Sequence, residues 1–223
     1  MKPCLNILIP TNKPFEKYLY EVYNSFLVAS YYVRNIVDWK LTVLSKENPN
    51  LDNCTWISEN EINNILQNES YSVSSAYNIL YNLSNRPDSV FITSDSYIVQ
   101  ATFFETYIDN HSRGIFNYCP HHIGHPAYPT PFYKIPIAGT PVLSTEFINN
   151  YLCGQIFPKG FIYHYADVAL SDYCHKIGRA IPIEYSTGLL RIEHSHNQVN
   201  DEEDKKTYDR MCREMESGVN IYE

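Results

Sequence analysis

The sequence predicts an α/β fold with a mixed, mainly parallel central sheet that is flanked by helices. Three short apolar runs, at 5–9, 39–45 and 89–93, are bounded by polar or proline-containing segments, which is typical of buried strands. Longer segments at 15–33 and 72–83 carry apolar residues at spacings of three and four, which indicates helices that pack on a sheet. Alternation of strands and helices at this spacing predicts parallel pairing.

The elements of the first half have local signals at their boundaries. The first strand ends at Pro10, which has no N–H to give to a sheet. The segment 46–52 is polar and contains a proline, so we expect a loop. A short helix is expected over 59–67, and Pro87 follows the end of the helix at 72–83.

The second half carries weaker patterns. Helices are expected over 97–107 and 145–152, and the hydrophobic run 180–192 predicts one further strand. The segment 119–141 is rich in proline and histidine, so we expect an ordered loop or short edge strands across the rim of the sheet. The acidic stretch 201–223 is helix-prone up to Gly218 and is expected to be a surface helix or a frayed tail.

Length and composition predict one domain, 1–200, followed by the acidic helix or tail 201–223. The formal charge of −8 argues against a nucleic-acid surface, which needs clustered lysine and arginine. The sequence has no run of 18 apolar residues, so no membrane span is predicted. It also has no basic segment followed by an apolar run, so no signal peptide is predicted, and the expected location is the cytoplasm. The six cysteines form no C-x-x-C pair, so we expect reduced thiols.

Polar residues follow the predicted strands of the first half. In parallel sheets, binding sites collect where strands reach their carboxyl ends. The residues expected at this rim include Pro10, Thr11 and Asn12 after the first strand, Glu47 and Asn48 after the second, and Ser94 and Asp95 after the third.

Asp95 and two later histidines are candidate ligands for a divalent cation. Asp95 closes a strand, where a carboxylate can hold a cation on a diphosphate, although Ser94-Asp95-Ser96 also suits a turn or helix cap. His194 and His196 are two residues apart, and either could bind Mn²⁺ or Mg²⁺ beside Asp95, or both could be surface histidines.

Asp167 is the candidate general base. It stands at the start of a predicted helix, after the aromatic segment Tyr163-His164-Tyr165. An aspartate at this position can accept a proton from an attacking hydroxyl, or cap the helix, and the two roles are compatible.

The histidine-rich segment invites a zinc hypothesis. The segment contains four possible zinc ligands, Cys119, His121, His122 and His125. Their spacing does not match that of a closed tetrahedral zinc motif, and the second pair of ligands of such a motif is missing. A loop that covers the active site is the better functional interpretation.

The order of these motifs resembles that of GT-A glycosyltransferases close to family 2. Ile9-Pro10-Thr11 resembles the end of the family's first strand, and Ala76-Tyr77-Asn78 resembles the helix before the aspartate motif, which here retains Asp95. Ala138-Gly139-Thr140 resembles the acceptor loop, and Ala166-Asp167 resembles the start of the catalytic helix. His194 or His196 resembles the metal-binding histidine that follows.

This resemblance implies a Rossmann-like GT-A fold and an inverting sugar transfer of the hexosyltransferase type. The donor would be a nucleotide-diphosphate sugar, in particular a UDP-sugar, and the acceptor a glycan or another hydroxyl compound. The implied nucleotide site comprises Pro10, Thr11, Asn12, Glu47, Asn48, Asn78, Ser94 and Asp95. The implied sugar site comprises Gly139, Thr140 and Ala166, the base is Asp167, and the ligands of Mn²⁺ or Mg²⁺ are Asp95 with His194 or His196.

Three other hypotheses remain open on the sequence. A nucleotidyltransferase would share the nucleotide-binding half, but the segment after the first strand has no glycine to wrap a triphosphate. A non-catalytic sugar- or nucleotide-binding module is motivated by Thr93 and Ala166, which stand where the family has acidic residues. A zinc-binding interaction domain would depend on the segment from His121 to His125.

Overall fold

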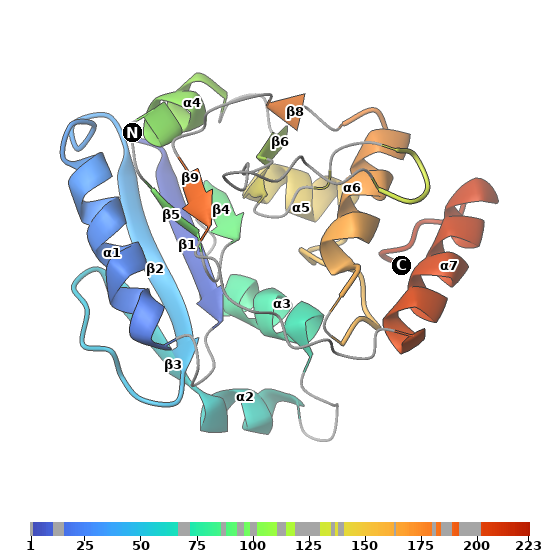
Figure 1. Ribbon diagram of the computed structural model, residues 1–223, viewed down its shortest axis with the longest axis horizontal. Coiled ribbons are helices and arrows are strands. Elements are labelled where there is room, and N and C mark those ends of the chain that lie inside the picture. The colour runs from blue at the N-terminus through green and yellow to red at the C-terminus, as the bar shows by residue number, and fades with distance from the viewer. Residues whose placement is uncertain are drawn as a thin grey trace.

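The structure is a computed structural model of the chain. It describes residues 2–10, 16–66, 72–85, 88–92, 96–98, 102–110, 115–118, 130–134, 137, 141–162, 164–179, 182–183, 189–191 and 202–223. Helices and strands alternate through the first half of the chain, as the sequence predicts, and helices dominate the second half (Figure 1).

The described strands form a seven-stranded sheet in the order β3-β2-β1-β4-β7-β6-β8. Its strands are β1 (Cys4–Pro10), β2 (Asp38–Ser45), β3 (Cys54–Ser58), β4 (Ser89–Ile92), β6 (Ile115–Tyr118), β7 (Val142–Ser144) and β8 (Pro182–Ile183). The pairs β3–β2, β2–β1, β1–β4 and β6–β8 are parallel, whereas β7 pairs antiparallel with both β4 and β6. The prediction of a mixed, mainly parallel sheet is confirmed.

The register of the parallel strands aligns their carboxyl ends. Pro10 of β1 lies opposite Leu44 of β2, and Leu8 of β1 lies opposite Ile92 of β4. Because the three strands run in one direction, the segments that leave them emerge at a single edge of the sheet. This edge is called the carboxyl edge below.

Helices cover both faces of the sheet (Figure 1). One face packs against α1 (Glu16–Ser30) and α4 (Thr102–Asn110), and its core includes Ile7, Phe26 and Phe103. The other face packs against α3 (Val73–Leu83), and its core continues through α5 (Thr145–Tyr151), α6 (Ala166–Lys176) and α7 (Glu202–Glu216). Ile7 and Leu8 of β1 belong to different cores because successive side chains of a strand point to opposite faces.

The chain reaches α3 through an edge strand and a short helix. β3 is followed directly by α2 (Glu59–Leu66), which buries Ile62 and Leu66. At the start of α3, Ser72 and Ser75 form a capping box: each side-chain oxygen accepts a hydrogen bond from the other residue's backbone N–H.

Three expectations from the sequence are corrected. The segment 54–58 is strand β3, although no strand was predicted there. The helix expected over 97–107 is a short strand, β5 (Ser96–Ile98), followed by α4. The single strand expected over 180–192 is two strands, β8 and β9 (Leu189–Arg191). Of the two alternatives expected for the chain end, the helix is found and the frayed tail is not: α7 spans Glu202–Glu216, and Tyr208, Met211, Met215 and Tyr222 are buried in the core.

Candidate functional site

The carboxyl edge brings together three of the residues predicted to bind the nucleotide. Pro10 is the last residue of β1, and Glu47 and Asn48 follow the end of the neighbouring strand β2. The Ser45 hydroxyl donates to the Glu47 carbonyl at 2.7 Å, and Asn48 Oδ1 accepts from the Asn50 N–H at 2.9 Å. These bonds fix a tight turn whose Glu47 and Asn48 side chains are exposed, beside the end of β1.

The two strands of a second sheet are close in sequence to the predicted metal ligands. β5 pairs antiparallel with β9, with Ser96 opposite Arg191 and Ile98 opposite Leu189. Asp95 directly precedes Ser96 in the chain, and His194 follows Arg191 by three residues. Two segments about 95 residues apart in sequence are therefore paired, and each ends within three residues of a candidate ligand along the chain.

Several predicted site residues lie outside the described part of the chain. They are Thr11, Asn12, Ser94, Asp95, Gly139, Thr140, His194 and His196, together with Cys119, His121, His122 and His125 of the zinc hypothesis. Within the described ranges, no group of three or more histidine, cysteine, aspartate and glutamate side chains could hold a metal ion. Among the same residues, no helix has the length and apolar character needed to cross a membrane.

Asp167 lies in the first turn of α6 and is half-buried. The helix begins at Ala166, which is buried, and its N-cap residue is Tyr165, so the predicted cap role of Asp167 is corrected. Tyr165 has φ +64°, a left-handed conformation that non-glycine residues rarely adopt. Asp167 Oδ1 accepts from the Val168 N–H at 2.9 Å. A residue held in a strained conformation beside the candidate base needs support from elsewhere in the fold.

The first support comes from Asp204 in the first turn of α7. Its side chain is buried and accepts two backbone hydrogen bonds, from Ile162 N–H to Oδ1 and from His164 N–H to Oδ2, both at 2.7 Å. The Ile162 carbonyl in turn accepts from the Val73 N–H at 2.8 Å, at the start of α3. The segment that leads into Asp167 is thus fixed from both sides, by α7 and by α3.

The second support comes from Tyr208, one turn further along α7. Its ring stacks on the Tyr165 ring with centroids 5.3 Å apart and planes at 28°. Its hydroxyl donates to Asp172 Oδ2 on α6, and Asp172 is fully buried. Burial, and then the hydrogen bond to Asp172, raise the pKa of Tyr208 well above its usual value, so the hydroxyl keeps its proton and donates throughout the neutral range.

The sequence reasoning missed Asp172, Asp204 and Tyr208. Tyr208, Met211, Cys212 and Met215 recur at spacings of three and four, which is the signal of one buried helix face and could have indicated that α7 packs on the domain. The contacts of Asp204 span about 40 residues, and no local pattern predicts them.

Asn78, predicted to bind the nucleotide, is used to hold a loop against α3. Its Oδ1 accepts from the N–H groups of Ile156 and Phe157 at 2.8 and 3.1 Å, and its Nδ2 donates to the Phe157 carbonyl at 2.9 Å. This structural use was not predicted from the sequence. A role of Asn78 in nucleotide binding stays a prediction.

Two solved structures are similar to this chain over most of its length. One is a mutant of Drosophila β-1,4-galactosyltransferase 7 in complex with manganese, UDP-Gal and xylobiose, with a TM-score of 0.58 and 12% identity over 92% of this chain and 79% of that chain. The other is mannosyl-3-phosphoglycerate synthase from Rubrobacter xylanophilus, with a TM-score of 0.55 and 13% identity over 97% of this chain and 75% of that chain. A scan against models of known protein families finds no match, and a search of curated protein sequences finds none.

These similarities define the fold. The chain has the GT-A glycosyltransferase fold, with the mixed, mainly parallel sheet and flanking helices that the sequence predicted. The carboxyl edge of β1 and β2 and the start of α6 are the places where the described residues hold candidate site groups.

Proposed function

We propose that the protein is an inverting glycosyltransferase that moves a sugar from a nucleotide-diphosphate donor, a UDP-sugar, to a hydroxyl acceptor. The GT-A fold and the similarity to a galactosyltransferase in complex with manganese and UDP-Gal support a nucleotide-sugar transferase. The observation that carries the proposal at residue level is the pairing of β5 with β9, because it aligns the chain beside Asp95 with the chain that leads to His194 and His196.

The chemistry of these residues suits Mn²⁺ or Mg²⁺. A carboxylate oxygen with an imidazole nitrogen, completed by diphosphate oxygens, is a donor set that such cations accept. In the proposal, Asp95 holds the cation with either His194 or His196. A bound cation would stabilise the negative charge that builds on the leaving nucleotide.

The remaining residues bind the donor and move a proton. The proposal assigns nucleotide binding to Pro10, Thr11, Asn12, Glu47, Asn48, Asn78 and Ser94. The proposal assigns Gly139, Thr140 and Ala166 to the sugar site. Asp167 accepts the proton of the acceptor hydroxyl while that oxygen attacks the anomeric carbon from the side opposite the diphosphate. Inversion follows from this single displacement.

Calorimetric titration of UDP with and without Mn²⁺, on the wild type and on Asp95→Ala, tests the donor site. The proposal expects binding that requires both the cation and Asp95. Titrations with GDP and dTDP follow if UDP fails, and absence of binding by all three nucleotides would contradict the proposal.

Asp167→Asn tests the base. We expect UDP affinity to stay unchanged, and hydrolysis of UDP-glucose, UDP-galactose or UDP-N-acetylglucosamine, whichever the wild type turns over, to fall by roughly 10²- to 10⁴-fold, because an amide cannot accept the proton. The matched control is Asp209→Asn on the exposed side of α7. Full activity of Asp167→Asn would assign the base to another residue, and no activity in the wild type would favour a non-catalytic binding module.

A further inference from the structure

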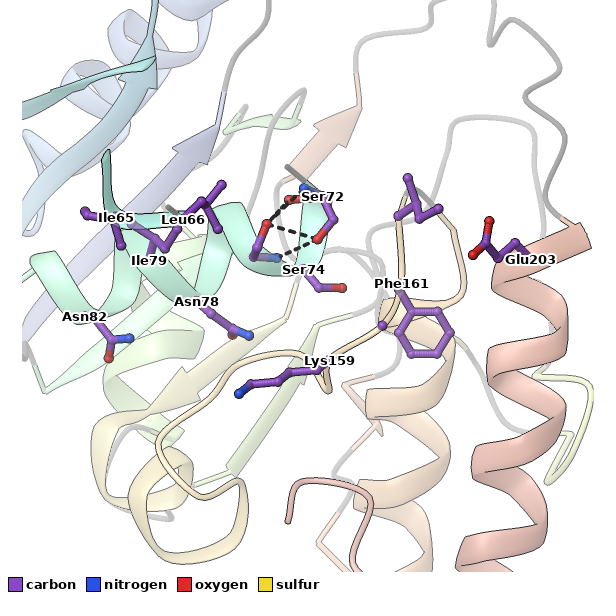
Figure 2. A pocket seen from close by; sticks show the side chains of 13 residues that line it. Ile65, Leu66, Ser72, Ser74, Asn78, Ile79, Asn82, Lys159, Phe161 and Glu203 are labelled. Carbon is purple, nitrogen blue, oxygen red and sulfur yellow. Dashed lines mark hydrogen bonds between the residues drawn. The ribbon is translucent and has the colours of Figure 1, made fainter. Parts of the chain in front are cut away.

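A cavity of about 880 Å³ lies on the outer side of α3, away from the sheet. Its walls come from the end of α2, the exposed face of α3, the segment 159–162 and the start of α7 (Figure 2). This volume is at the upper end of the range of small-ligand pockets, roughly 300–1,000 Å³, and is large enough for more than one sugar ring.

One buried hydroxyl at the wall of this cavity has no partner. Ser74 is 2% exposed, and no described group forms a hydrogen bond with its Oγ. Its neighbours Ser72 and Ser75 satisfy each other in the capping box, and Figure 2 shows the Ser74 hydroxyl directed away from Ser72 and toward the segment that carries Phe161. A buried hydroxyl without a partner is unfavourable, and a ligand hydroxyl at this end of the cavity would satisfy it.

The other lining groups fit an uncharged ligand with many hydroxyls. Lys159 and Glu203 are exposed and carry opposite charges, so together they add no net charge to the cavity. Asn82 offers both a donor and an acceptor from the exposed face of α3. Ile65 and Leu66 of α2 supply an apolar wall for the C–H face of a sugar ring.

The cavity adjoins the segment that leads to the candidate base. Phe161 and Ile162 line it, the Ile162 carbonyl is bonded to Val73 at the start of α3, and Asp167 follows Ile162 by five residues. A ligand in the cavity therefore contacts both α3 and the chain that positions Asp167.

We propose that this cavity binds the non-reacting sugars of an oligosaccharide acceptor, an assignment that rests on the proposed transferase function. Ser74 and Asn82 bind sugar hydroxyls, Lys159 and Glu203 bind those nearer to solvent, and Ile65 and Leu66 pack on a sugar face. The protein then selects an acceptor of at least two sugars.

Binding of the labelled protein to a printed glycan array tests this assignment. The wild type is expected to bind one class of related oligosaccharides. Asn82→Trp fills the open side of the cavity and is expected to lower the signal at least tenfold, whereas Asn63→Trp, at an exposed asparagine of α2 outside the cavity, keeps it. Ser74→Ala is expected to lower affinity roughly fivefold, the loss of about one hydrogen bond. Circular dichroism confirms that each variant is folded.

The outcomes separate this assignment from the transferase proposal. If the wild type binds no printed glycan, or if Asn82→Trp binds as the wild type does, the cavity is not the acceptor site, whatever UDP does. If glycans bind in an Asn82-dependent way but neither UDP nor another nucleotide binds with Mn²⁺, the transferase proposal fails and the cavity remains a saccharide site of a binding module.

Discussion

The two faces of the sheet are held by different kinds of contact. Under α1 and α4 the core is apolar and includes a cluster of aromatic rings, in which the Phe26 ring lies 6.0 and 6.2 Å from the rings of Phe103 and Phe104 at steep angles. On the α3 face, directed hydrogen bonds cross the core, and both buried carboxyl side chains in the described part of the chain, Asp172 and Asp204, belong to its helices. The difference indicates that the first face supplies stability and the second fixes positions near Asp167.

The largest stability loss is expected on the first face. Phe26→Ala removes a fully buried ring that also packs on Trp39 at 5.8 Å, and we expect it to lower the free energy of unfolding by about 3–5 kcal/mol. Urea unfolding measures this change, and Leu27→Ala, at a neighbouring side chain that is 44% exposed, is the control. If the comparison holds, the folded Phe26→Ala protein at low temperature keeps the wild-type turnover rate.

Asp204→Asn tests the second face. The amide keeps one acceptor oxygen but turns an NH₂ group toward a backbone N–H, so we expect a loss of about 1–3 kcal/mol in the free energy of unfolding. Because the chain before Asp167 loses one of its two hydrogen bonds to α7, we also expect turnover to fall roughly tenfold or more with UDP affinity unchanged. Paired measurements of unfolding and of steady-state kinetics check both parts, with Asp209→Asn as the control.

The comparison of Phe26→Ala with Asp204→Asn tests whether the two faces have different roles. A fall in turnover in Phe26→Ala comparable with that in Asp204→Asn would mean that activity follows overall stability. The inference that the first face supplies stability and the second fixes positions near Asp167 would then be wrong.

The sequence predicted the long central elements better than the short strands and the edge strand, for a physical reason. Strands β1 and β2 are buried on both sides and appear as continuous apolar runs, and α1 and α3 carry apolar residues at helical spacing. Strand β3 was missed because it lies at the sheet edge and only Ile57 of its five residues is buried. β5, β8 and β9 have two or three residues each, too few to show any periodicity.

The positions of the candidate site residues were also predicted unevenly from the sequence. Pro10, Glu47 and Asn48 could be placed at one edge from the sequence, because carboxyl ends of parallel strands meet there. The support of Asp167 could not, since Asp204 and Tyr208 lie about 40 residues further along the chain and act through backbone groups and ring contacts that leave no motif. Only the three-dimensional arrangement of α6 and α7 brings them to the start of α6.

Tyr208→Phe tests the hydroxyl of that residue separately from its ring. The variant keeps the ring that stacks on Tyr165 and loses the hydroxyl that donates to Asp172, so we expect a loss of about 1–2 kcal/mol in the free energy of unfolding, because Asp172 stays buried with one partner fewer. Tyr32→Phe, at a residue that is 79% exposed, is the control in the same urea titration. Turnover is expected to change less than in Asp204→Asn, since the backbone attachment of the segment is intact. An equal fall in turnover would assign the positioning of Asp167 to the hydroxyl as well.

The smallest expected effect is a pH dependence from Cys174, which is buried in α6 on the second face. Burial raises the pKa of its thiol from 9.0 to about 12. The folded chain keeps the proton between pH 9 and 12, where the unfolded chain has lost it, so this contribution to stability is complete below pH 9 and declines as the pH rises. Cys174→Ala and Cys174→Ser lack the thiol, and we expect their destabilisation relative to the wild type to shrink by about 1 kcal/mol between pH 8 and pH 10. Urea unfolding at the two pH values measures this change. A constant difference would show that the thiol ionises as easily in the folded chain as in the unfolded one, and that the core beside α6 is open to water.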